Sequence, residues 1–150
     1  MALCTELQGF LDAVDMVLEE TMVREIAPLT VKMLQSKIES EVYAVDWPAR
    51  RYQRKEYNHG LIDPREIEWK YESKTNTLTV KSIRDDWEPT MERHAGRNVA
   101  EVVESGQGYD WHPVKPRPFH KPAEDQLVAT GELDFALSQT MEAYLGPWSW

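Results

Sequence analysis

The sequence lacks several features on which common protein functions depend. Cys4 is the only cysteine, so a disulfide within the chain and a cysteine-based metal cage are both excluded. No apolar run approaches the ~20 residues that cross a bilayer. The first residues show no basic stretch followed by an apolar run. We therefore expect no membrane insertion and no secretion signal, and we expect the chain to fold in a cytoplasm.

Motifs typical of enzymes, cofactors and metal sites are missing as well. The sequence contains no HExxH, no GxSxG and no GxxxxGK[ST], and no lysine follows the glycine pair Gly106 and Gly108 as a phosphate-binding loop requires. Asp110, His112 and His120 could gather around a metal, but ordinary loop histidines are the better interpretation. The sequence therefore predicts a protein without catalytic residues, cofactor or metal.

Basic residues are scarce and unevenly placed. The chain has 26 acidic and 17 basic residues, a formal net charge of −9, and no Lys or Arg after Lys121. This balance argues against a general nucleic-acid binder, which needs cations to displace counterions from phosphate. Arg50, Arg51, Arg54 and Lys55 nevertheless cluster in one loop. Such asymmetry favours a subunit whose basic loop meets an acidic surface of a neighbour, although a solvated loop remains the simpler alternative.

The sequence does contain a pattern that predicts helices on either side of a hairpin. Its length suits a single domain, 1–150. Residues 5–45 carry apolar side chains at helical spacing, with Pro28 expected to kink or break the helix. Residues 67–72 and 77–81 alternate apolar and polar side chains, which predicts an antiparallel hairpin. A short helix or strand is expected from Val99 to Gly106.

A last helix is predicted to begin near Pro122 and to end at Gly146, with a possible bend at Gly131. Two irregular segments complete the pattern. Residues 47–64 are rich in turn signals and form an unusually long loop, and residues 109–119 form a proline-rich extended arm. We interpret these segments as an interaction loop and an interaction arm.

Three short motifs resemble those of a siphophage head–tail joining family, the tail-completion or tail-component proteins. The first runs from Val42-Tyr43 through Pro48 and Arg51-Tyr52 to Gly60-Leu61 and Asp63-Pro64; the second is Val103-Glu104-Ser105-Gly106 with Gly108-Tyr109; the third is Arg117-Pro118-Phe119 followed by Pro122. Their order and spacing extend over residues 34–145. The charged stretch 85–97 and the ending Pro147–Trp150 depart from the family pattern.

The resemblance implies an α+β fold with N-terminal helices, a small antiparallel β-sheet and a C-terminal helix packed on the sheet. It also implies a structural protein of the virion neck that forms a homo-oligomeric ring, hexameric by expectation, between the head connector or stopper and the tail terminator or tail tube. DNA would pass through the lumen without sequence-specific binding. The expected location is the virion, after assembly in the host cytoplasm.

Two alternatives stay open. One is a tail terminator or another ring protein of the same neck, and the other is a small nucleic-acid-binding or regulatory module that uses the basic loop. If the ring interpretation is right, Arg and aromatic residues of the loop and the arm are the candidates for the subunit interface. These candidates are Arg50, Arg51, Tyr52, Arg54, Tyr57, Trp111, Arg117 and Phe119. Their alternative roles are core packing for Tyr52 and Phe119 and plain solvation for the arginines.

Overall fold

The computed structural model describes residues 2–44, 60–84, 98–106 and 115–146, and of residues 2–6 and 145 it describes the backbone alone. The N-terminal elements are α1 (Ala2–Thr21), the π-helical turn η1 (Met22–Ile26), α2 (Ala27–Lys37) and the π-helical turn η2 (Ile38–Tyr43). The 3-10 turn η3 (Pro64–Glu66), strands β1 (Ile67–Glu72) and β2 (Thr77–Ser82), and helices α3 (Val99–Ser105), α4 (His120–Thr130) and α5 (Glu132–Leu145) follow.

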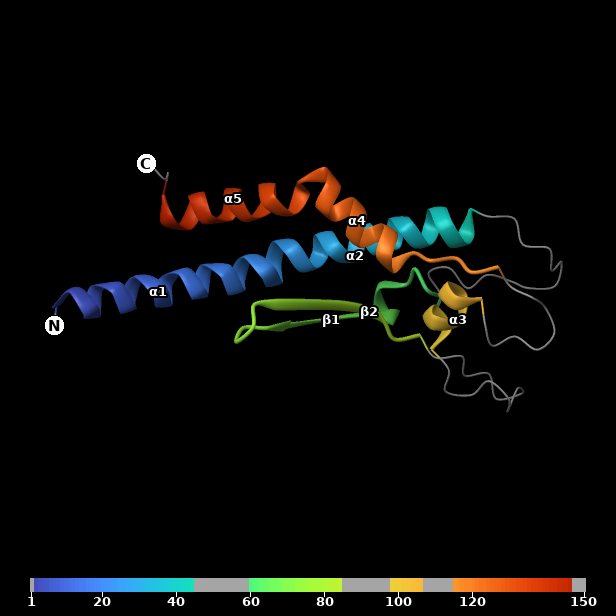
Figure 1. Ribbon diagram of the computed structural model, residues 1–150, viewed down its shortest axis with the longest axis horizontal. Coiled ribbons are helices and arrows are strands. Elements are labelled where there is room, and N and C mark those ends of the chain that lie inside the picture. The colour runs from blue at the N-terminus through green and yellow to red at the C-terminus, as the bar shows by residue number, and fades with distance from the viewer. Residues whose placement is uncertain (1, 45–59, 85–97, 107–114, 147–150) are drawn as a thin grey trace.

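The four N-terminal elements join end to end into one long helix that runs the length of the molecule (Figure 1). Pro28 does not break it. Proline has no backbone N–H to donate to the preceding turn, and the wider turn η1 lies directly before it. The backbone N–H of Ala27 donates to the carbonyl of Met22, five residues back. The expected kink is therefore replaced by a local change of helical pitch.

The π-helical turn also decides which side chains of the long helix are buried. Val17, Thr21 and Ile26 are buried, at spacings of four and then five residues. The spacing of five spans η1, where a π turn returns a side chain to the same face one residue later than an α turn. Leu18 and Met22, which a uniform α-helical stripe would place inside, are only partly buried.

The predicted hairpin is confirmed. β1 and β2 pair antiparallel from Ile67 opposite Ser82 to Glu72 opposite Thr77, and both strands contact α2. The turn between them ends at Asn76, whose positive φ of 50° suits asparagine. Asn76 also accepts a hydrogen bond from the Tyr71 hydroxyl at 2.7 Å.

The α+β class is confirmed, with the C-terminal part divided into two helices. Gly131 ends α4 in the left-handed conformation, φ 67°, which any side chain would strain. α4 contacts α2 and α5 contacts α1, so this pair packs mainly on the long helix. Figure 1 shows the long helix between the C-terminal pair on one side and the hairpin on the other. The C-terminal helices were expected to pack on the sheet, but they pack mainly on the long helix, which is therefore the central layer.

One core joins these layers. It is built around Ile38 and Phe119, both with 0% of their surface exposed, and receives apolar side chains from α2, β1, α3 and α4. Its buried members are Met33, Leu34, Ile38, Val42, Leu61, Ile62, Ile67, Ala100, Phe119, Ala123 and Leu127. None of the helices in the described ranges is long and apolar enough to cross a membrane.

Phe119 provides a test of this core. Phe119→Ala is expected to lower the free energy of unfolding by about 3–5 kcal/mol, because it leaves a cavity in the core to which Phe119 contributes a fully buried ring. Phe135→Ala, on α5, is the matched control: Phe135 is 68% exposed, so its loss should cost less than about 0.5 kcal/mol. Urea unfolding of both variants measures the difference, and equal costs would contradict this description of the core.

Candidate subunit interface

Six of the eight interface candidates lie outside the described residues. These are Arg50, Arg51, Tyr52, Arg54, Tyr57 and Trp111. The points where the described chain meets the predicted loop and arm are nevertheless informative. The long helix ends at Tyr43, the chain resumes at Gly60, and the arm is described again from Lys115.

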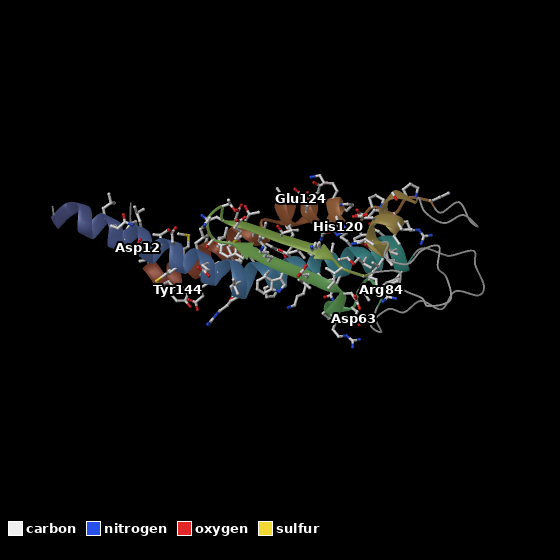
Figure 2. The ribbon with its side chains drawn as sticks, turned by 90° about the horizontal axis from the view of Figure 1, so that it is seen from below. Asp12, Asp63, Arg84, His120, Glu124 and Tyr144 are labelled. Atoms are coloured by element: carbon white, nitrogen blue, oxygen red, sulfur yellow. The ribbon has the colours of Figure 1, made fainter. Side chains whose placement is uncertain are left out.

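These points lie at one end of the molecule, which we call the loop end: η2, η3, α3 and the start of α4. Figure 2 places Asp63, Arg84 and His120 at this end and Asp12 and Tyr144 at the other. Hydrogen bonds connect its parts. Gln35 on α2 donates to the carbonyl of Ile62 at 2.7 Å, and the backbone N–H of Val99 donates to the carbonyl of Arg84 at 2.8 Å. The predicted loop and the predicted arm are therefore attached beside each other.

Arg117 joins the arm to the end of the long helix. Its backbone N–H donates to the carbonyl of Val103 at 3.0 Å, and its guanidinium Nη1 donates to the carbonyl of Val42 at 3.3 Å. The last carbonyls of a helix have no partner within the helix, and a cation suits the negative end of its dipole. Arg117 is half-buried, so this interface candidate also has a structural role within the chain.

Phe119 lies in the core and offers no surface to a partner, because none of its side chain is exposed. The expectation that it contributes to a subunit interface gives way to the alternative, core packing. The aromatic ring stacks on that of His120, with 4.5 Å between ring centroids. Apolar patterning alone cannot show whether an aromatic residue at the end of a proline-rich arm is buried in the core or exposed to a partner.

Glu104 of α3 holds the beginning of α4. Its Oε1 accepts the backbone N–H groups of Phe119 at 3.1 Å and His120 at 2.8 Å, and it lies 2.8 Å from Nδ1 of His120. The first N–H groups of a helix have no partner within the helix, and a carboxylate there also suits the positive end of the helix dipole. A side chain fifteen residues away thus performs the capping that a neighbouring residue usually provides.

The electrostatics of Glu104 follow from this position. Partial burial on its own would raise the pKa of the carboxyl, but the two backbone N–H donors and His120 outweigh it, so the pKa is lowered. Glu104 is therefore held in its charged form, in which it binds the helix start most strongly.

Asp63 performs a similar task at η3. Its side chain is almost completely buried, accepts the backbone N–H of Arg65 at 3.0 Å and forms an ion pair with Nη2 of Arg65 at 2.6 Å. Asn98 completes the set: its Oδ1 caps α3 by accepting the N–H of Ala100, and its amide donates to the carbonyl of Ser82 at 2.9 Å. These contacts fix the geometry of the loop end.

Glu104, Asp63, Asn98 and Arg117 therefore all have structural partners at the loop end. Within residues 2–44, 60–84, 98–106 and 115–146, no three histidines, cysteines or carboxylates gather closely enough to hold a metal ion. These hydrogen bonds hold together the points at which the predicted loop and the predicted arm are attached.

A protein-family model named YomN matches residues 6–143. The chain belongs to the YomN family. The family name is phage-derived, so the chain is a phage-associated protein, and this much of the sequence resemblance is confirmed. Comparisons with curated proteins and with solved structures found no match.

In this YomN-family chain, the residues that carry the motif resemblance meet at the loop end. Val42 and Asp63 come from the first motif, Glu104 from the second and Arg117 from the third, and all four make hydrogen bonds at the loop end. The sequence interpretation missed Glu104 and Asn98 as structural residues. Asn98 could have been found, because an asparagine directly before an apolar helix start is a capping signal. The partner of Glu104 is distant in sequence, so no local signal exists.

The role of Glu104 can be measured through pH. Glu104→Gln is expected to lower the free energy of unfolding by about 1–2 kcal/mol at pH 7, because the amide is a weaker acceptor for the helix N–H groups than the carboxylate. A carboxyl with a lowered pKa stabilises the fold above its ordinary pKa of 4.5, and this stabilisation is lost as the pH falls through the folded-state pKa.

The difference between wild type and Glu104→Gln should therefore shrink as the pH falls below 4.5. Unfolding by urea between pH 7 and pH 3 measures it. Glu101→Gln replaces an exposed carboxylate of the same helix and serves as the control. A Glu104→Gln cost that is as large at pH 3 as at pH 7 would show that the charge is not the source of the stabilisation.

Proposed function

We propose that this chain is a structural protein of the phage neck. In this proposal it forms a ring that joins the head connector to the tail tube, DNA passes through the lumen, and the protein carries no catalytic step. Membership of the YomN family supports a phage role in general. The resemblance to head–tail joining proteins supports the particular role, and the shape of the molecule supports assembly into a ring.

The observation that carries the proposal is the difference between the two ends of the molecule. One end attaches the predicted loop 47–64 and arm 109–119 to a hydrogen-bonded base, and the other consists of helices alone (Figure 1). A ring requires a heterologous contact, in which one patch of a subunit meets a different patch of the next copy. A long subunit with two unlike ends supplies two such patches.

The charge of the chain suits a ring that surrounds DNA. With a formal net charge of −9, the surface repels phosphate, so a passing duplex would slide instead of binding. A hexamer is the proposed copy number, with the head connector or stopper on one side and a tail terminator or the tail tube on the other. A ring with a basic lumen, seen by cryo-electron microscopy, would contradict this part of the proposal.

The proposal predicts that the basic loop contributes to assembly. The double variant Arg51→Ala, Arg54→Ala should stay folded as a monomer but form rings or particles at least about tenfold less efficiently, because arginines at interface centres often contribute more than 1 kcal/mol each. Analytical ultracentrifugation of the purified chain and the yield of completed particles in infected cells measure the two effects.

A matched control is Lys70→Ala, Lys74→Ala, which removes two cations from exposed positions of the hairpin. It should leave assembly unchanged. Unchanged assembly in the arginine variant, or absence of the chain from purified virions, would contradict the proposed role. A steep loss of DNA affinity with rising salt would instead favour the nucleic-acid-binding alternative.

A further inference from the structure

The first turns of α1 carry three large apolar side chains that no other described element covers. Leu7, Phe10 and Leu11 lie three and four residues apart, on one face, and are 59%, 49% and 47% exposed. We call them the α1 stripe. Figure 1 shows this part of α1 projecting past the end of α5 and past the tip of the hairpin. A contiguous exposed apolar patch of this kind usually marks a contact surface.

The stripe continues a face that is buried further along the same helix. Val14 is half-buried and Val17 is 9% exposed. α1 contacts α5, and Figure 1 shows α5 running beside the later turns of α1 and ending before its first turns. The uncovered turns thus extend a surface on which a helix of this chain already packs. Because Leu7 and Val14 are about 10 Å apart along the axis, an occupying helix of two to three turns in line with α5 covers the stripe.

Carboxylates near the stripe restrict what this occupant can be. Asp12 and Asp15 of α1 are exposed, and so is Glu142 in the last turn of α5. Figure 2 shows Asp12 and Tyr144, which also belongs to the last turn of α5, at the same end of the molecule. None of the ion pairs among the described residues includes these three carboxylates. The surface around the stripe therefore presents unpaired negative charge.

The cations of the described chain do not neutralise this charge. The sequence has no Lys or Arg before Arg24 and none after Lys121, so α1 and α5 supply no cation to the surface. Arg24, in the turn that follows α1, is already paired with Glu20 at 3.1 Å. Lys70 and Lys74 belong to the hairpin, whose tip ends before the stripe begins (Figure 1). A partner is therefore needed to supply positive charge here.

The combination of an apolar stripe with nearby carboxylates selects among the classes of partner. A second copy of this chain does not fit, because its formal net charge is −9 and its loop end exposes the carboxylates of Glu39, Glu41 and Glu101. Nucleic acid does not fit either, because carboxylates repel phosphate. A helix with one apolar face and Lys or Arg beside that face satisfies both features of the surface.

We propose that the α1 stripe binds a basic amphipathic helix of another protein. The apolar face of that helix buries Leu7, Phe10 and Leu11, and its Lys and Arg side chains lie opposite the carboxylates of α1 and of the end of α5. Apolar burial provides the affinity, and the opposite charges select the partner and its orientation. The inference concerns a protein other than this chain and does not depend on the proposed ring.

Two synthetic peptides test the chemistry of the partner. The basic peptide has about 18 residues, which is long enough to form a helix, with Leu on one face and Lys on both sides of that face. The acidic peptide keeps every Leu and replaces each Lys by Glu. Fluorescence anisotropy of the labelled peptides with the purified full chain should show at least about tenfold tighter binding of the basic peptide. Equal affinity for the two peptides, or no binding of the basic one, would overturn the proposal.

A stripe variant locates the binding surface. It carries Leu7→Gln, Phe10→Gln and Leu11→Gln, which keep good helix formers on the surface, so circular dichroism should show an unchanged helical content. It should bind the basic peptide at least about tenfold more weakly than the wild type. The matched control is Val128→Gln, Phe135→Gln, because these side chains are 71% and 68% exposed on the C-terminal helices. Wild-type affinity in the stripe variant, or an equal loss in the control, would place the site elsewhere and overturn the proposal.

A charge variant separates local carboxylates from the net charge of the chain. Asp12→Asn, Asp15→Asn should weaken binding of the basic peptide by about threefold or more and reduce its dependence on salt concentration. Glu39→Gln, Glu41→Gln removes two exposed carboxylates from the loop end and should leave the affinity within about twofold of the wild type. Equal losses in both variants would show attraction to the net charge alone, which contradicts a site on α1.

Two further measurements address the other possible occupants of the stripe. Wild-type dimers in analytical ultracentrifugation that the stripe substitutions abolish would show that a second copy covers the stripe. Binding of the basic peptide only after truncation following Gly146 would show that the chain's own tail covers it. Either result would overturn the proposal. None of these outcomes changes the assembly test of Arg51→Ala, Arg54→Ala, so this surface and the proposed ring stand or fall separately.

Discussion

The structure depends on covering a helix that is too long for the rest of the chain to enclose. At 1.5 Å per residue, the helix from Ala2 to Tyr43 is roughly 60 Å long. The hairpin and α4 cover its second half and α5 covers part of its first half, while the first turns remain uncovered by any described element. The position of the core near α2, the division into two unlike ends and the exposure of Leu7, Phe10 and Leu11 all follow from this mismatch in length.

Local signals were enough to predict most of the secondary structure. The alternation around Trp69 and Leu78 gave the hairpin, and the glycines at 106, 131 and 146 marked helix ends, two of them in the left-handed conformation that favours glycine. The kink expected at Pro28 was wrong because proline usually breaks a helix, and the composition of the sequence does not indicate a π turn that would accommodate it. The packing of α4 and α5 on the long helix was also beyond local signals, because apolar periodicity shows which face is buried and not what covers it.

The candidate site could be predicted only in part, for a related reason. Arginine and aromatic content indicates where contacts are made but not whether the partner is another subunit or the chain itself. Phe119 and Arg117 show this: the first is core, and the second binds the end of the long helix. The described residues of the motifs that resemble those of head–tail joining proteins form hydrogen bonds that hold the loop end together.

The π turn before Pro28 affects how the two ends of the molecule are oriented relative to each other about the long helix. An α-helix advances by about 100° per residue, and η1 inserts the equivalent of one extra residue between α1 and α2. The start of α1 is therefore set at a fixed angle about the helix axis relative to the loop end. Loss of one residue in η1 would rotate the start of α1 relative to the loop end, about the axis of the long helix, by about that angle. In the proposed ring, where each subunit must meet two neighbours at once, such a rotation would change the angle between successive subunits.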